Sequence, residues 1–379
     1  MQSIKNKNVL VSGASIAGLS TAYWLNKLGY RVTIVEMAHQ PRTGGAAINI
    51  QGAALESAKR MGIYEQLKAH ALQLVLWEFK NADDVTAGVM DMLNDDEPLS
   101  DGNDHAEEIE IERDKLIFIL MGTLKTDVEF IFGNSITALN ETQDGINVTF
   151  KSGLQRNFDL VFGCDGLHSA VRKIWFGHEA EYSQFLQYYF SITIVNKLLI
   201  KESTAQMYNV PDKMVMLNAY NNKTDIVFCF FSEKEIVYDY RNAEQQKQII
   251  LEQFAGQGWK TPELLEEIKQ AKISYFDKIS QIRMPSWTKG RVALVGDAGY
   301  CASPAAGYGA SLAMAGAVTI ADALEKHNGN FEAAFFEYDQ NLRPFIEAVQ
   351  TNAVNMLSNY LIPRTEEAIQ LRNTQQIPF

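Results

Sequence analysis

The chain has few cysteines and histidines, and this limits the chemistry it can carry. Its only cysteines among 379 residues are Cys164, Cys229 and Cys301, so a disulfide-stabilised secreted scaffold is excluded and a reducing, cytoplasmic environment is expected. The six histidines are scattered, with no His-x-x-x-His or Cys-x-x-Cys spacing, so we expect no metal site. A Gly-x-Ser-x-Gly nucleophile motif is also absent.

Long apolar runs and clustered basic residues are missing as well. No stretch of about 18 apolar residues occurs, so no transmembrane segment is predicted. The net charge is −12 and no basic stripe offsets it, so we expect no nucleic acid partner. Residues 1–5 lead directly into an apolar strand, so we expect no cleaved signal. The acidic stretch between Asp91 and Glu108 is typical of a solvated loop or edge.

The first positive signal is a glycine-rich turn near the N-terminus. The apolar run 8–12 predicts a strand, 19–25 predicts a helix, and 31–36 predicts a second strand that ends in Glu36. The turn between strand and helix contains Gly13, Ser15, Ala17 and Gly18, with Ser15 in place of the usual middle glycine. This context is that of a dinucleotide fingerprint, in which the helix N-terminus faces a pyrophosphate and the acid binds ribose hydroxyls.

Two further strand-to-turn motifs lie downstream. The apolar strand 158–164 runs into Asp165-Gly166, with Ser169 and the cation Arg172 shortly after. The strand 291–295 is followed by Gly296-Asp297 and then by a glycine- and alanine-rich loop and helix. A carboxylate after a buried strand can accept hydrogen bonds from a polyol, and the glycines allow backbone N–H groups to approach a ligand. Alone, the middle motif could equally be an ordinary strand-to-helix turn.

Together the three motifs resemble the single-component FAD-dependent monooxygenases of the para-hydroxybenzoate hydroxylase type, in order and spacing along most of the chain. The tetracycline-inactivating monooxygenases share this layout and a similar length, but no residue here singles out tetracycline. The resemblance implies that FAD is held by the three motifs, by Arg42 in a mobile-flavin segment, by Arg113 in a helix-opening Arg-x-x-Leu, and by the loop Pro304, Gly307 and Gly309.

The same resemblance implies the chemistry. NAD(P)H would reduce FAD, the reduced flavin would react with O2 to give a C4a-hydroperoxide, and one oxygen would pass to an electron-rich small molecule. We nominate no catalytic side chain, and Tyr300 and Tyr308 are expected to pack or to form hydrogen bonds. Many members have His at the position of Tyr300, Asn at that of Ser311, and an acid near Gly316, so the substrate and subclass are left open.

The predicted fold is α/β, with a Rossmann-like FAD-binding domain, a β-sheet substrate-binding cap and a C-terminal helix. A hairpin turn at 221–224 separates two alternating cap strands, and helices are predicted at 245–254 and 262–272. The domain assignment is 1–74, 104–180 and 276–345 for FAD binding, 75–103 and 181–275 for the substrate, and 346–379 for a bracing helix. We expect a monomer or a weak homo-oligomer.

The cap strands carry large apolar residues at alternating positions. One face is expected to cover the flavin and to accept an aromatic or polycyclic substrate. The residues concerned are Tyr188, Phe190, Ile192, Ile194, Met214, Met216, Phe228 and Phe230. Two alternatives remain open: a flavin-dependent reductase or dehydrogenase on the same fold, and a non-catalytic FAD-containing protein that binds a ligand.

Overall fold

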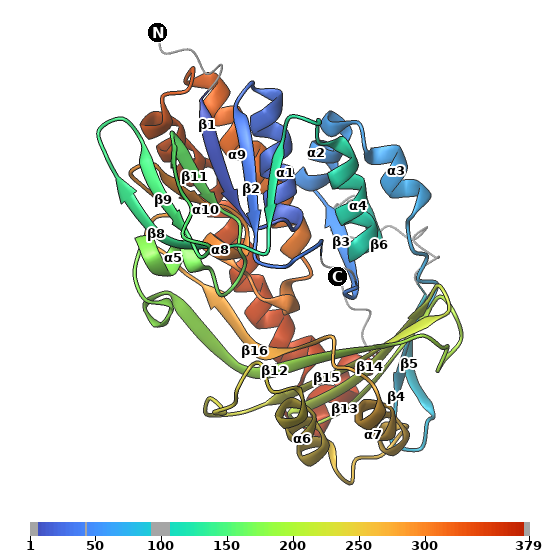
Figure 1. The fold of residues 1–379 in the computed structure, drawn as a ribbon. Coiled ribbons are helices and arrows are strands. Elements are labelled where there is room, and N and C mark those ends of the chain that lie inside the picture. Colours follow the sequence, from blue (N-terminus) through green and yellow to red (C-terminus); the bar gives the residue numbers. More distant parts are fainter. Residues whose placement is uncertain (1–6, 42–43, 92–106, 375–379) are drawn as a thin grey trace.

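The computed structural model describes residues 7–41, 44–91 and 107–374. Two β-sheets of different kinds lie one above the other in Figure 1, and the C-terminal helices run from the upper sheet to the lower one. This arrangement confirms the predicted α/β class. Within these described ranges, no helix is both long and apolar enough to cross a membrane.

The upper sheet has six strands in the order β17-β18-β11-β1-β2-β7, and all but the edge strand β17 are parallel. Its apolar central strands are buried, as expected for a parallel sheet covered by helices. The strands are β1 (Asn8–Ser12), β2 (Arg31–Glu36), β7 (Glu129–Phe132), β11 (Leu160–Gly163), β17 (Thr288–Lys289) and β18 (Val292–Leu294).

Helices pack in layers against this sheet: α1 contacts β1 and β2, α9 packs on α1, and α10 packs on α9. An antiparallel meander leads the chain into β11. The helices are α1 (Ile16–Lys27), α2 (Ala53–Met61), α3 (Tyr64–Ala69), α4 (Arg113–Thr123), α5 (Ala170–Trp175), α8 (Asp297–Tyr300), α9 (Gly309–Lys326) and α10 (Phe331–Asn355), and the meander strands are β8 (Ile136–Glu141), β9 (Ile146–Phe150) and β10 (Gln155–Phe158).

The lower sheet, which we call the cap sheet, has seven strands in the order β16-β12-β15-β14-β13-β4-β5. Only β13 and β4 pair in parallel. At the predicted hairpin turn, Asn221 and Asn222 both have positive φ, as a type I′ turn requires. The strands are β4 (Leu76–Lys80), β5 (Thr86–Asp91), β12 (Ser183–Val195), β13 (Thr204–Val210), β14 (Lys213–Tyr220), β15 (Lys223–Phe231) and β16 (Tyr275–Ile282).

The two faces of the cap sheet have different neighbours. Helices α6 (Ala243–Phe254) and α7 (Thr261–Gln270) cover the outer face, below the sheet in Figure 1. The inner face is turned toward the upper sheet. Both helices and the hairpin agree with the sequence prediction. Strand β16 extends the cap sheet to Ile282, so the boundary predicted at 275–276 falls where this strand begins.

A short two-stranded ribbon lies between the sheets. It consists of β3 (Ala47–Gln51) and β6 (Glu108–Glu112), paired antiparallel with Asn49 opposite Glu110. Because side chains alternate along a strand, Ile109 and Ile111 enter the core, and the glutamates of β6 share the other face. Figure 1 places this ribbon above the inner face of the cap sheet.

The C-terminal segment connects the two sheets. After α10 the chain forms a π-helical turn (Met356–Leu361) and α11 (Glu366–Thr374), which contacts β5 and β13 of the cap. The buried Arg372 donates to the carbonyl of Tyr360 at 2.6 Å and to Asn209 at 2.8 Å. Burial lowers the pKa of Arg372 to about 10. The predicted boundary at 346 falls inside α10, which is one continuous helix.

Candidate functional site

The glycine-rich turn after β1 is fixed by close backbone packing. Gly13 has φ of +107°, and a Cβ there would overlap the carbonyl oxygen of Cys164. A Cβ on Gly18 would overlap the carbonyl oxygen of Gly13 itself. The turn therefore requires both glycines, and it brings the N-terminal motif against the strand that carries the middle motif. Ser15 precedes the first turn of α1, whose free N–H groups can face an anion.

Glu36 ends β2 beside this turn. One carboxylate oxygen accepts the N–H of Ala14 at 2.9 Å, and the other accepts the N–H of Ala38 at 2.9 Å. The residue is only 9% exposed. Its position at the carboxyl end of β2, against the turn, is the one that a ribose-binding acid needs.

Arg113 opens α4 and reaches the same turn. Its guanidinium donates to the hydroxyl of Ser15 at 2.9 Å and to the carbonyl of Gly44 at 3.4 Å. A Cβ on Gly45 would lie 3.0 Å from the Arg113 side chain. Arg113 thus connects the N-terminal motif to the Gly44-Gly45 segment. Arg42, predicted to bind the cofactor, lies outside the described residues.

The late Gly-Asp motif meets the N-terminal one. Gly296 has φ of +69°, and a Cβ there would lie 3.0 Å from that of Ala17. Asp297 follows as the first residue of α8 and is half-buried. Burial raises the pKa of its carboxyl, whereas the Cys301 thiol and the Arg113 guanidinium lower it. No lysine or arginine among the described residues forms an ion pair with Asp297, so its oxygens are suited to hydroxyl donors.

The loop at Pro304, Gly307 and Gly309 borders open space. Gly307 has φ of +67°, and a Cβ on Gly307 or Gly309 would meet no atom within 4 Å. The loop is tied to the ribbon through Ser311, whose hydroxyl accepts the N–H of Gln51 at 3.0 Å and donates to the carbonyl of Asn49 at 3.1 Å. Ser311 therefore joins the loop to the ribbon, at one of the positions where the sequence departs from the family that it resembles.

The middle motif is organised around two capping interactions. Asp165 accepts the N–H of Val171 at 3.1 Å and the hydroxyl of Ser169, and Ser169 in turn accepts the N–H of Arg172 at 2.9 Å. Ser169 is thus the N-cap of α5. Gly166 has φ of +83° and borders open space.

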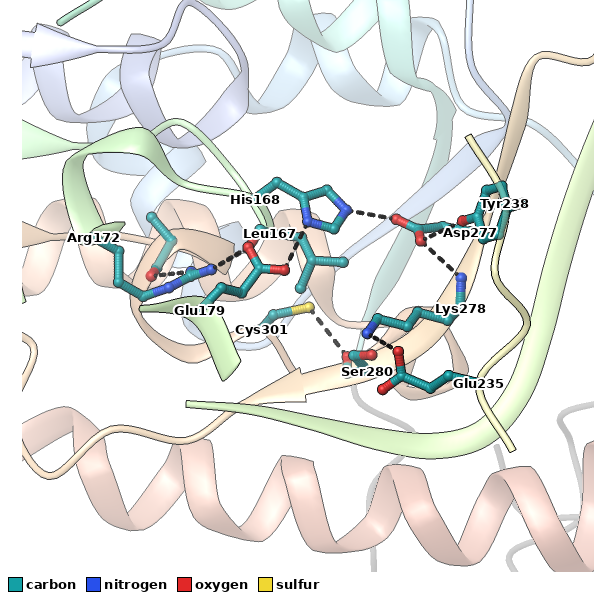
Figure 2. A network of polar contacts seen from close by, with 11 residues as sticks. Leu167, His168, Arg172, Glu179, Glu235, Tyr238, Asp277, Lys278, Ser280 and Cys301 are labelled. Carbon is teal, nitrogen blue, oxygen red and sulfur yellow. Dashed lines mark hydrogen bonds and ion pairs between the residues drawn. The ribbon is translucent and has the colours of Figure 1, made fainter. Parts of the chain in front are cut away.

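Arg172 is fully buried and is held within the protein. Its guanidinium donates to the carbonyls of Leu167 and of Ala298, the latter at 2.8 Å, and forms an ion pair with Glu179 at 3.0 Å (Figure 2). Because Ala298 belongs to α8, Arg172 joins the middle motif to the late one. Direct contact between Arg172 and a cofactor stays a prediction.

His168 connects the middle motif to the cap sheet. Figure 2 shows its ring between Glu179, at 3.0 Å, and Asp277 of β16, at 2.8 Å. Asp277 also accepts the hydroxyl of Tyr238 at 3.1 Å. Hydrogen bonds to Asp277 and then to Glu179 raise the pKa of His168 to about 9. Sequence reasoning missed this contact, because no local pattern pairs a loop residue with a strand 109 positions away.

Tyr300 and Gly316 form a matched pair. A Cβ on Gly316 would collide with the Tyr300 hydroxyl. That hydroxyl accepts from Tyr338 at 3.0 Å, and Tyr338 also reaches the carbonyl of Leu294. Tyr300 is 1% exposed and contacts Trp287, so it packs as expected. Two of the three departures noted in the sequence, Tyr300 and Gly316, are therefore one structural feature.

The inner face of the cap sheet carries half-buried apolar side chains. Phe190, Ile192 and Met216 pack on a cluster that also includes Ala305 of the loop. Phe228 and Phe230 were expected on the same side, and this expectation is wrong. They belong to the outer face, where both contact Phe254 of α6.

Sequence reasoning did not identify the strand β6 and assigned the acidic stretch up to Glu108 to a solvated loop or edge. The alternation Glu-Ile-Glu-Ile-Glu over 108–112 is a strand signal that could have revealed it. Most of that acidic stretch lies outside the described residues.

The residues present fit a flavin dinucleotide. Three glycine turns meet at the carboxyl ends of adjacent parallel strands, and the carboxylates of Glu36 and Asp297 lie beside them. Residues 6–353 match the family model described as "FAD binding domain".

The chain belongs to this family.

The relatives of the chain agree with this assignment. A flavin-dependent monooxygenase of Legionella longbeachae is 34% identical over 360 residues, covering 94% of this chain and 90% of the relative. Another, from an unknown prokaryotic organism, is 35% identical and covers 97% and 94%. The crystal structure of tetracycline destructase Tet(55) superposes with a TM-score of 0.85 at 34% identity, covering 98% and 95%. The protein is an FAD-dependent monooxygenase that uses O2 and acts on a small molecule.

Proposed function

We propose that this monooxygenase hydroxylates a planar aromatic or polycyclic compound bound between the Pro304–Gly309 loop and the inner face of the cap sheet. The observation that carries the proposal is the set of incompletely covered side chains on that face. Phe190, Ile192 and Met216 are half-buried, and Tyr275, opposite Ile192 in the register, is 40% exposed. A flat apolar molecule would cover them, and the unbranched Met216 can adapt to its shape.

The names of solved relatives support a fused-ring substrate. Tet(51) and Tet(55) are both called tetracycline destructases, at 32% and 34% identity, and tetracycline is a polycyclic compound. The inner cap face offers no pair of cations that would select a small, highly charged acid, within the part of the chain that the structure describes.

We assign the cofactor contacts as follows. The turn from Gly13 to Gly18 and the α1 N-terminus receive the pyrophosphate of FAD, Glu36 its ribose, and Asp297 its ribityl chain. The loop at Pro304, Gly307 and Gly309 lies against the ring system. Arg113 orients the turn through Ser15. Asp165-Gly166 borders the cofactor on the side of β11. When bound, FAD supplies the redox chemistry, with NAD(P)H as reductant.

The chain's own residues bind, orient and exclude water. No side chain is assigned a proton-transfer role, since Tyr300 is buried in a hydrogen-bonded pair and Tyr308 packs on Phe345. The proposal also keeps the discontinuous domain division and a monomer or weak homo-oligomer. A reducing, cytoplasmic location is supported by three buried free thiols.

The test is a screen of polycyclic compounds in which NADH or NADPH oxidation and product mass are followed together. The purified protein is expected to be yellow, to release FAD on denaturation, and to oxidise the reductant faster with a true substrate, giving a product with one added oxygen. Reduction of the compound without added oxygen would instead assign the chain to a flavin-dependent reductase. A protein that cannot be loaded with FAD would contradict the cofactor assignment.

A further inference from the structure

The β3–β6 ribbon, next to the position proposed for the substrate, carries carboxylates that have no cationic partner among the described residues. In the ribbon, Glu108, Glu110 and Glu112 share one face of β6 and point away from the core, as the burial of Ile109 and Ile111 requires. Glu112 is neutralised by Lys223 and also accepts from Asn221. Among the described residues, no Lys, Arg or His forms an ion pair with Glu108 or Glu110.

The cap sheet brings a further carboxylate to the same place. Asp225 on β15 lies directly opposite Asn218 on β14, and Asn218 donates to Glu110 at 3.5 Å. The register places this pair in the row next to Ile192, Val227 and Met216. The apolar side chains proposed to contact the substrate are thus bordered by polar side chains from the ribbon and from the cap sheet, which are far apart in sequence.

Asp225 is the unusual member of this group. It is 2% exposed, and one of its oxygens accepts the Tyr220 hydroxyl at 2.9 Å. The other oxygen is buried and has no partner at hydrogen-bond geometry among the described residues, although the Ala47 N–H lies near enough to the carboxyl to lower its pKa. A buried carboxylate oxygen without a donor costs free energy, which a donor from a ligand, directly or through a water, would recover.

The electrostatics point in the same direction. Burial, and then the charge of Glu108, raise the pKa of Glu110 to about 7. Burial raises the pKa of Asp225 to about 6, although the Tyr220 hydroxyl, the Ala47 N–H and Lys223 oppose the shift. Carboxylates that repel one another in a partly desolvated site are stabilised by an added cation.

We propose that Glu110, with Asp225 behind it, forms a specificity-determining subsite for a protonated amine carried by the aromatic substrate. This proposal rests on the proposed function, because it takes the substrate to bind between the Pro304–Gly309 loop and the cap sheet. The substrate class is accordingly a flat, largely apolar molecule with a basic nitrogen at one end. The apolar part of the substrate covers Ile192 and Met216, and its ammonium group donates hydrogen bonds to the carboxylates of the subsite.

The test compares two probes of nearly equal shape with the FAD-loaded protein. 1-Naphthylmethylamine carries an ammonium, whereas 1-naphthylmethanol is neutral. Binding is followed by the change in the flavin absorption spectrum, without NAD(P)H and under exclusion of oxygen. At about pH 8, where Glu110 with a pKa of about 7 is ionised, we expect the ammonium to bind at least about tenfold more tightly.

The variants decide whether this preference comes from the proposed subsite. Glu110→Gln should abolish it, and Asp225→Asn should reduce it. Glu252→Gln is the matched control, because Glu252 is exposed on α6 at the outer side of the cap and its loss changes the net charge equally. Equal affinity of the wild type for both probes, absence of ammonium binding, or an unchanged preference in Glu110→Gln would overturn the subsite. Since no turnover is involved, failure of oxygenation would contradict the proposed function and leave the subsite standing.

Discussion

The turns that we assign to the flavin, here called the flavin-side turns, are tightly packed, whereas the inner face of the cap sheet presents side chains that are only partly covered. Gly13, Gly18 and Gly296 have almost no room for a Cβ. By contrast, Ile192 and Met216 are half-buried, and Tyr275 is 40% exposed. The tight packing of the turns allows only one backbone conformation, which suits a ligand that is always the same. The partly covered side chains of the cap sheet suit a substrate site, because replacing a few of them would change which substrate is bound.

This comparison predicts that the largest loss of stability comes from the turns. Gly18→Ala should lower the free energy of unfolding by about 3 kcal/mol or more, since the new Cβ would overlap the Gly13 carbonyl. Gly122→Ala is the control, because Gly122 lies in α4 and has nothing within 4 Å of its Cβ direction. It should be neutral or stabilise by up to about 1 kcal/mol. Urea unfolding of both variants checks this, and equal effects would contradict it.

The next effect concerns cofactor affinity rather than folding. Asp297→Ala should weaken FAD binding by about 1.5–3 kcal/mol, because a carboxylate acceptor for the ribityl hydroxyls is lost. Glu36→Ala should also weaken FAD binding, and it removes the acceptor of the Ala14 N–H as well. Equilibrium dialysis of FAD, with far-UV circular dichroism as the check on folding, measures both. Undiminished affinity in either variant would show that its motif has been misread.

A smaller effect tests the Tyr300 and Gly316 pair behind the flavin-side turns. Gly316→Ala should destabilise by about 2 kcal/mol, since the Cβ collides with the Tyr300 hydroxyl. Tyr300→Phe should cost about 1 kcal/mol through the lost hydrogen bond with Tyr338. The double variant should be about 1 kcal/mol more stable than the sum of the single changes predicts. If the effects of the two substitutions on thermal unfolding were strictly additive, the proposed packing of the Tyr300 hydroxyl against Gly316 would be excluded.

The smallest effect concerns the contact between the two regions. The folded pKa of His168, about 9, is raised above its ordinary value by Asp277 and Glu179. Its contribution to stability is therefore complete below about pH 6.5 and is lost as the pH rises through about 9. The ring is 57% exposed, so the contribution should stay below about 1 kcal/mol. Urea midpoints of wild type and His168→Gln should converge toward high pH. If the two urea midpoints differed by the same amount at every pH, the contact of His168 with Asp277 and Glu179 would be contradicted.

The sequence was sufficient to predict that the three glycine motifs belong to one nucleotide-binding fold, for a physical reason. Each motif follows an apolar run, and the carboxyl ends of neighbouring parallel strands meet at one edge of a sheet, here β18, β11 and β1. The motif residues thus come together through local patterns alone. Arg172 was recognised as a fixed cation, but its complete burial against α8 depends on contacts more than 100 residues away.

The substrate side could not be predicted in the same detail. Strand pairing decides which residues share a face, and a shift by one position exchanges the faces. Tyr189 pairs with Phe230, so Phe230 lies on the outer face, away from Tyr188. The meeting of Glu110 with Asn218 and Asp225 depends on the ribbon and the cap sheet together, and no local pattern encodes it.

The most direct test of the central claim is turnover under heavy dioxygen. The FAD-loaded protein is supplied with NAD(P)H and with a polycyclic compound that stimulates its oxidation, and the product is examined by mass spectrometry. We predict that one oxygen atom of the product carries the label and that labelled water contributes none to it. A product formed without label from dioxygen would contradict monooxygenation by this chain.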